Sequence, residues 1–188
     1  MAFMKFGVIQ AMICIAFVTA VDYSGQDMRG QSFIGMDHSM SVFSGADMRG
    51  GNYYGSNFSS SDFSGSDLRG SNFNGCTFSR SDFSGSKFSG SHFRGCAFYW
   101  SDYSGSDFSG SEFSGCDFSH SKFNGADFTG SYYYGSDFGI SAFNNSDFSG
   151  SEFLGSNFGE SDFTDADFSG STFTSSIFTG NNFVKERS

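Results

Sequence analysis

Proline is absent from this chain of 188 residues, and leucine, isoleucine and valine are scarce. Globular cores usually mix those aliphatic residues, so their scarcity argues against an ordinary core. Twenty-eight phenylalanines and twenty-six glycines stand in their place, beside abundant serine. Low complexity often indicates disorder, but 20% of the residues are aromatic, which favours a folded chain. One large aromatic residue used throughout indicates a single packing position repeated many times, in one domain.

Basic residues are also few, since ten Lys and Arg stand against twenty Asp and Glu, for a net charge of −10. Nucleic-acid backbones are bound through Lys and Arg, so this balance argues against nucleic acid as a partner. It is compatible with plain solubility, with cation binding or with imitation of DNA.

The one long apolar run, residues 6–18, is shorter than the roughly twenty residues that a transmembrane helix needs. It follows Lys5 and precedes Thr19 and Ala20, which is the order of a secretory signal peptide. We therefore predict a signal peptide over residues 1–20 and a secreted or extracytoplasmic protein (periplasm, lumen or outside). After cleavage we expect no stable membrane insertion. The alternative is a short anchor or helical plug retained on the mature chain.

A five-residue repeat fills the rest of the sequence, as thirty-three consecutive blocks from Val21 to Lys185 without insertion or deletion. The first residue of a block is mostly Ser, the second often Asp or Asn, the third Phe in twenty-five blocks, and the fifth mostly Gly. A period of five fits neither a regular helix nor a plain strand. It fits a short extended segment whose first and third residues point inward, followed by a corner that glycine permits.

A second period of twenty lies above the first. Seven blocks whose fifth residue is not Gly recur every twenty residues; they end in Met40, Ser60, Arg80, Trp100, His120, Ile140 and Glu160. Twenty residues are four blocks, so the coil should have four sides, with one wall chemically different from the others.

Blocks such as SDFSG, ADFTG and SDLRG resemble the pentapeptide-repeat family. The resemblance implies an all-β fold, a right-handed quadrilateral β-helix over residues 21–185 with four pentapeptides per coil and about eight coils, followed by a tail at 186–188. Residues twenty apart should then stack, including the inward column Phe63, Phe83, Tyr103, Phe123, Phe143 and Phe163. The inward serines should bond backbone groups at neighbouring corners.

Outward aspartates should stack as well, for example in the column Asp27, Asp47 and Asp67. Arginines two residues after each acid could relieve the repulsion between these like charges. The alternative, which we favour, is that each Asp bonds the local backbone of its turn.

Cys76, Cys96 and Cys116 also lie twenty apart and should form an inward column. They fit buried small residues that replace Ser; the alternatives are a disulfide between Cys76 and Cys96, or less readily a metal site. We expect no metal, no cofactor and no enzymatic activity, because no nucleophile stands beside a base and the repeat has no long loop to carry a site. Asn57 and Asn144 begin candidate N-glycosylation triplets, a weak signal in such a repeat.

Two functional hypotheses follow. The first is a secreted, non-enzymatic structural or surface-interaction solenoid that assembles end to end into fibres, with a protein or polysaccharide partner that the sequence does not identify. The alternative, implied by the family resemblance, is an acidic DNA-mimicking regulator of an enzyme such as gyrase. Binding of an ordered surface such as ice or a polysaccharide is a weaker third idea.

Overall fold

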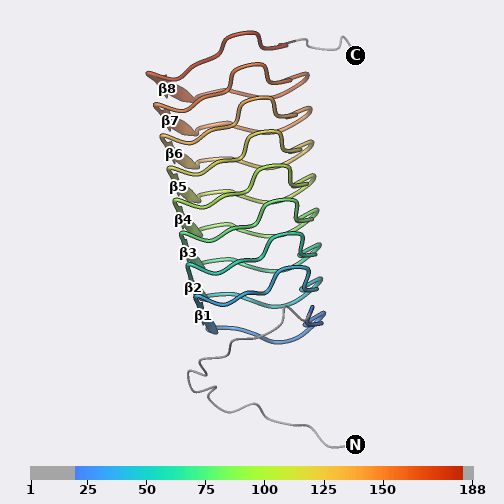
Figure 1. Ribbon diagram of the computed structural model, residues 1–188. Coiled ribbons are helices and arrows are strands. Elements are labelled where there is room, and N and C mark those ends of the chain that lie inside the picture. The colour runs from blue at the N-terminus through green and yellow to red at the C-terminus, as the bar shows by residue number, and fades with distance from the viewer. Residues whose placement is uncertain (1–19, 184–188) are drawn as a thin grey trace, which may run out of the picture.

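The computed structural model describes residues 20–183, and these form a stack of coils along one axis (Figure 1). Eight three-residue strands, one per coil, form a single parallel sheet in the order β1 to β8. Each strand pairs with the next at an offset of twenty residues, so that Phe73 lies beside Phe93. The strands are β1 (Ser32–Ile34), β2 (Asn52–Tyr54), β3 (Asn72–Asn74), β4 (His92–Arg94), β5 (Glu112–Ser114), β6 (Tyr132–Tyr134), β7 (Glu152–Leu154) and β8 (Thr172–Thr174).

The other three walls pair through single parallel bridges, again twenty residues apart. One bridge in each wall illustrates the pattern: Asp62 with Asp82, Asp107 with Asp127, and Asp117 with Asp137. The chain is therefore a quadrilateral β-helix with four pentapeptides per coil, and it has the right-handed sense that parallel crossovers adopt. The predicted fold class is confirmed.

The interior is filled by the third residues of the blocks. In the predicted column the ring centroids lie 4.7 Å apart between Phe63 and Phe83, and 5.1 Å apart between Phe83 and Tyr103. The column continues through Phe123, Phe143 and Phe163 with separations of 4.9–5.0 Å. Rings of adjacent walls meet edge to face, as Phe63 and Phe78 do at 71°. Both arrangements suit the quadrupole of an aromatic ring.

Buried serines join successive coils. The Ser81 hydroxyl donates to the Phe58 carbonyl at 2.9 Å and accepts the Ser61 backbone N–H at 3.1 Å. The same pair of bonds recurs at Ser101, whose hydroxyl donates to Phe78 and accepts from Ser81. These hydroxyls are satisfied by backbone groups of the preceding coil, as expected. An unpaired buried hydroxyl would otherwise cost on the order of 1–3 kcal/mol.

Every corner lies in the left-handed region of backbone conformation, whichever residue occupies it. Gly135 has a φ of 57° and Ile140, at the next corner, has a φ of 56°. The seven non-glycine corners of the sequence period share this conformation, so they differ from the glycine corners in side chain and not in backbone.

Candidate functional site

The three cysteines of the described chain are free and buried thiols. The alternative of a disulfide between Cys76 and Cys96 stays a prediction, which the parallel side-chain directions of a stacked column disfavour. Contact with the Cys96 thiol, together with burial, raises the pKa of Cys76 above its usual range. Contact with Cys116 and burial raise the pKa of Cys96 to about 12. At Cys116 burial acts to raise the pKa, but hydrogen bonds to Cys96 and to nearby backbone groups outweigh it, so that the pKa is lowered.

The two candidate glycosylation residues lie half-exposed on the outside of the coil. The Asn57 amide donates to the Asp37 carboxylate at 3.2 Å, and its oxygen accepts from the Ser59 hydroxyl at 2.7 Å. The backbone N–H of Asn144 donates to the Asn124 side chain at 3.2 Å. Both residues thus belong to polar contacts between or within coils.

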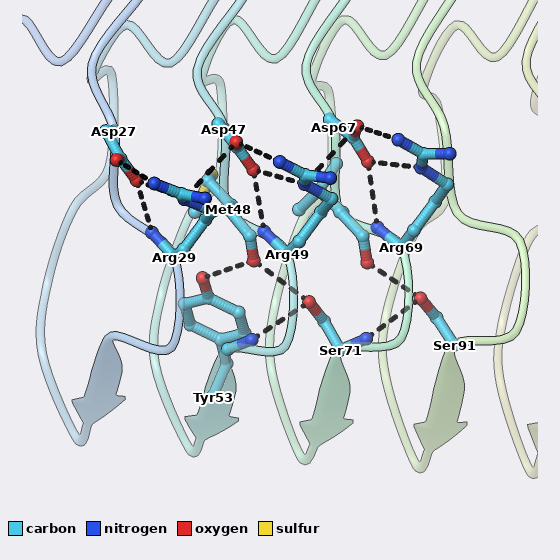
Figure 2. A network of polar contacts seen from close by, with 12 residues as sticks. Asp27, Arg29, Asp47, Met48, Arg49, Tyr53, Asp67, Arg69, Ser71 and Ser91 are labelled. Carbon is cyan, nitrogen blue, oxygen red and sulfur yellow. Dashed lines mark hydrogen bonds and ion pairs between the residues drawn. The ribbon is translucent and has the colours of Figure 1, made fainter.

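The outward aspartates make both kinds of contact that the sequence suggested. On three walls the carboxylate accepts the backbone N–H two residues on, as in Asp82 to Ser84 at 2.9 Å. Where arginine follows, the carboxylate also binds its guanidinium, as Figure 2 shows for three successive coils. Arg29 donates to Asp27 at 2.8 Å and lies 3.6 Å from Asp47 of the next coil. Hydrogen bonding to Arg29 lowers the pKa of Asp27 to about 2.

The wall formed by β1–β8 and the corners that follow them, here called the strand wall, has no aspartate in its second positions. The chain stays extended there from the second to the fourth residue, so the local turn that aspartate closes on the other walls is absent. The second and fourth side chains both project outward from a strand. Two outward columns therefore run along this wall, and their residue types vary from coil to coil.

Between these two columns lies a groove of about 430 Å³ that crosses β3 to β7. Its lining includes the third residues of the strands, such as Phe93 and Phe113, whose side chains are buried in the core. Tyr132 and Tyr134 of β6 stand on either side of it and are 54% and 63% exposed. Because these exposed rings stand together beside a groove, this stretch is a candidate binding surface.

Polar groups of both signs line the same groove. His92 Nδ1 lies 3.1 Å from Glu112 Oε2. Arg94 and Glu152 also line the groove, and neither takes part in a salt bridge within residues 20–183. Asn72 donates to Asn52 of the preceding coil at 3.0 Å. The groove therefore offers hydrogen-bond donors and acceptors beside apolar ring surface.

Sequence reasoning did not predict the groove, although the wall that it described as chemically distinct does differ from the others in its corner side chains. It singled out the wall that ends in the non-glycine corners, where the Trp100 and His120 rings stack at 4.8 Å on the surface. The groove lies on the preceding wall, which ends almost always in Gly. The signal available in the sequence was the second position, since blocks that begin at 31, 51 and every twenty residues onward never carry Asp there.

Two kinds of feature are absent from residues 20–183. No His, Cys, Asp or Glu side chains of this part gather in a group that could hold a metal ion. In the same range no helix has the length and apolar character required to cross a bilayer. The predicted signal peptide lies outside this range apart from Ala20, as does the predicted tail at 186–188.

Comparisons with solved structures show the same fold. A trypsin-treated form of QnrB1, a plasmid-mediated fluoroquinolone resistance protein, has a TM-score of 0.52 and 18% identity over 82% of this chain and 92% of that one. Full-length QnrB1 has a TM-score of 0.50 and 20% identity over 85% and 92%. Among curated proteins, no sequence matches this chain significantly.

Two family models match most of the repeat. The model of the pentapeptide repeat region matches residues 52–123, and the model of pentapeptide repeats in eight copies matches residues 27–65 and 142–180. The blocks, their stacking at twenty residues and these matches agree, and the chain belongs to the pentapeptide-repeat family.

Proposed function

We propose that this protein is a secreted, non-enzymatic β-solenoid that serves as a structural or surface-interaction rod, and that its rods associate end to end. The order of residues 1–20 supports secretion. Membership of the pentapeptide-repeat family, whose solenoids are typically non-catalytic, supports a non-enzymatic role.

The observation that carries the assembly proposal is the C-terminal end of the described stack. β8 pairs with β7 alone among the eight strands, so its other edge faces outward along the rod axis. Phe173 and Phe183, which belong to the last coil, are 37% and 55% exposed, whereas Phe153 one coil earlier is fully buried. An open strand edge beside exposed rings is a template for another chain.

The N-terminal end offers a matching surface. β1 pairs with β2 alone, and Tyr23 and Phe33 are only partly buried. A C-terminal coil placed on this end would continue the parallel pairing and the ring columns. Because the two contacting surfaces differ, the contact is heterologous and does not close, which yields filaments.

Sedimentation velocity and electron microscopy of the processed protein, collected after secretion, test this proposal. We expect masses that grow with concentration and rods that lengthen by whole units. The double variant Phe173→Glu/Phe183→Glu should remain monomeric, because charge at the end blocks apolar contact. Ile140→Glu, which places the same charge on an exposed corner away from the ends, should assemble normally. A monomeric wild-type protein over a wide concentration range would refute end-to-end assembly.

N-terminal sequencing of the same material tests secretion. A mature chain beginning at Val21 supports the signal peptide, and a chain retained in cells with residues 1–20 attached contradicts it.

A second candidate function is imitation of DNA by the acidic rod, acting on an enzyme such as gyrase. Asp62, Asp82 and Asp102 stack along one wall at the spacing of the coils, which provides a regular line of negative charge. The likeness to QnrB1 shows a shared fold, and the resistance named for QnrB1 belongs to that protein. A gyrase supercoiling assay with the mature protein tests this candidate, and unchanged supercoiling at high protein concentration would exclude it.

A further inference from the structure

We infer that the groove of the strand wall is a binding site for a linear, uncharged polysaccharide that lies along the rod axis. This inference deepens the surface-interaction part of the proposed function and rests on it, but it does not require the rods to associate.

The shape of the groove favours an extended ligand. It crosses β3 to β7 and runs from coil to coil, at right angles to the strands. With a strand spacing of about 4.8 Å, five coils make a groove roughly 20 Å long. Both outward columns border it along this length, so an extended chain could contact side chains of several successive coils at once.

The ring surface of the groove suits sugar rings. Tyr132 and Tyr134 both project outward from β6, one in each outward column, and Leu154 follows Tyr134 in the next coil. Tyrosine combines a flat apolar face with a polar hydroxyl, and the apolar face of a pyranose can pack against such a ring while its hydroxyls reach past it. A tyrosine side chain has only two rotatable torsions, so it offers a large contact area at a small cost in side-chain entropy.

The polar groups of the groove suit hydroxyls rather than a charged ligand. A hydroxyl both donates and accepts, and it therefore needs partners of both kinds. Asn74 supplies both, Arg94 donates, and Glu112 and Glu152 accept. The two carboxylates disfavour an anionic ligand, and Arg94 disfavours a strongly cationic one. The remaining possibility that uses all of these groups is an uncharged, hydroxyl-rich chain.

A peptide fits the wall less well. Peptides that bind sheets usually add a strand at an open edge and gain main-chain hydrogen bonds. In the strand wall the backbone groups are already paired between coils, as in Gly95 N–H to Ser114 and Gly115 N–H to Tyr134. The open edges lie at the ends of the rod, away from the groove. An incoming peptide would have to bind through side chains alone.

The test is binding of the secreted protein to amorphous cellulose, chitin and an insoluble β-1,3-glucan, with soluble xylan in affinity electrophoresis. Heparin and a mixed basic peptide serve as charged probes. We expect retention by at least one neutral polysaccharide and none by the charged probes. Tyr132→Ala and Tyr134→Ala should each weaken binding about tenfold, as loss of an aromatic contact at the centre of a site commonly does.

Tyr99→Ala is the matched control, because Tyr99 is an exposed tyrosine of the neighbouring wall that does not line the groove. It should bind like the wild type. The proposal is overturned if no neutral polysaccharide is retained, if the basic peptide or heparin binds instead, or if Tyr99→Ala weakens binding as much as the groove variants. Sedimentation of the groove variants separates the two proposals, since they should assemble like the wild type whether or not they bind sugar.

Discussion

The hydroxyl of Tyr53 occupies the space in which a β-carbon at Gly51 would lie. Gly51 stands in a first position, which serine fills in the next six coils of the same wall. The Tyr53 hydroxyl reaches the Met48 carbonyl at 3.4 Å, and the same carbonyl accepts the Ser71 hydroxyl at 3.0 Å (Figure 2). Glycine and tyrosine are therefore a matched pair that replaces serine and phenylalanine.

This pairing predicts the outcome of a double-mutant cycle. Gly51→Ser should lower the free energy of unfolding by about 1–3 kcal/mol, because the tyrosine ring cannot move in a packed column. Tyr53→Phe together with Gly51→Ser should recover most of that loss, since it restores the pair found at Ser71 and Phe73. Thermal or denaturant unfolding of the four proteins measures the coupling. Additive effects would show that the two side chains do not compete for space.

Tyr133 occupies the same column but follows a serine, and its buried hydroxyl has no hydrogen-bond partner. We predict that Tyr133→Phe raises the free energy of unfolding, by on the order of 1 kcal/mol, because it removes an unsatisfied polar group. Its ring would keep the stacking with Phe113 at 4.9 Å and Phe153 at 4.6 Å. The same change at Tyr53, which has a partner, should not stabilise. Equal effects at both positions would contradict this account.

The corner at Ile140 places a β-branched residue at a φ of 56°, a conformation that favours glycine. We predict that Ile140→Gly stabilises the protein by on the order of 1 kcal/mol. The reverse test is Gly135→Ala at a φ of 57°, where an added β-carbon would meet no atom within 4 Å. Any loss of stability there comes from the backbone alone. A lower melting temperature for Ile140→Gly would show that packing in the corner column outweighs the strain.

His38 occupies a phenylalanine position, is 8% exposed, and has no hydrogen-bond partner at either ring nitrogen. Burial among Tyr23, Phe33, Phe43 and Phe58 lowers the pKa of His38 from its ordinary 6.5, and the nearby Asp37 carboxylate opposes this only in part. The unfolded chain therefore takes up a proton more readily than the folded one. The contribution of His38 to the free energy of unfolding therefore has its full value above about pH 6.5, and it decreases as the pH falls below that value.

His38→Phe should remove this part of the pH dependence, and it should raise stability most at acid pH. Melting temperatures between pH 5 and 8 provide the measurement. His120→Gln, at an exposed corner, should keep the wild-type dependence. An unchanged slope in His38→Phe would show that His38 is not the group responsible.

The sequence was enough to predict the coil, because a period of five sets one wall and a period of twenty sets four walls. It also predicted the inward column through Phe63 and Phe83 and the backbone bonding of the serines. It did not distinguish the two readings of the aspartates, since Asp27 and Arg29 can satisfy each other and the turn at once.

Residue order by itself determined which side chains point inward and which residues stack, because both depend only on counting along the chain. Only the tertiary structure decided which wall stays extended through its fourth residue, and therefore where two outward columns border a groove. It also decided that the Tyr53 hydroxyl fills the space beside Gly51 while the Tyr133 hydroxyl has no partner. Those outcomes depend on the relative placement of coils and corners in space, which counting along the chain does not give.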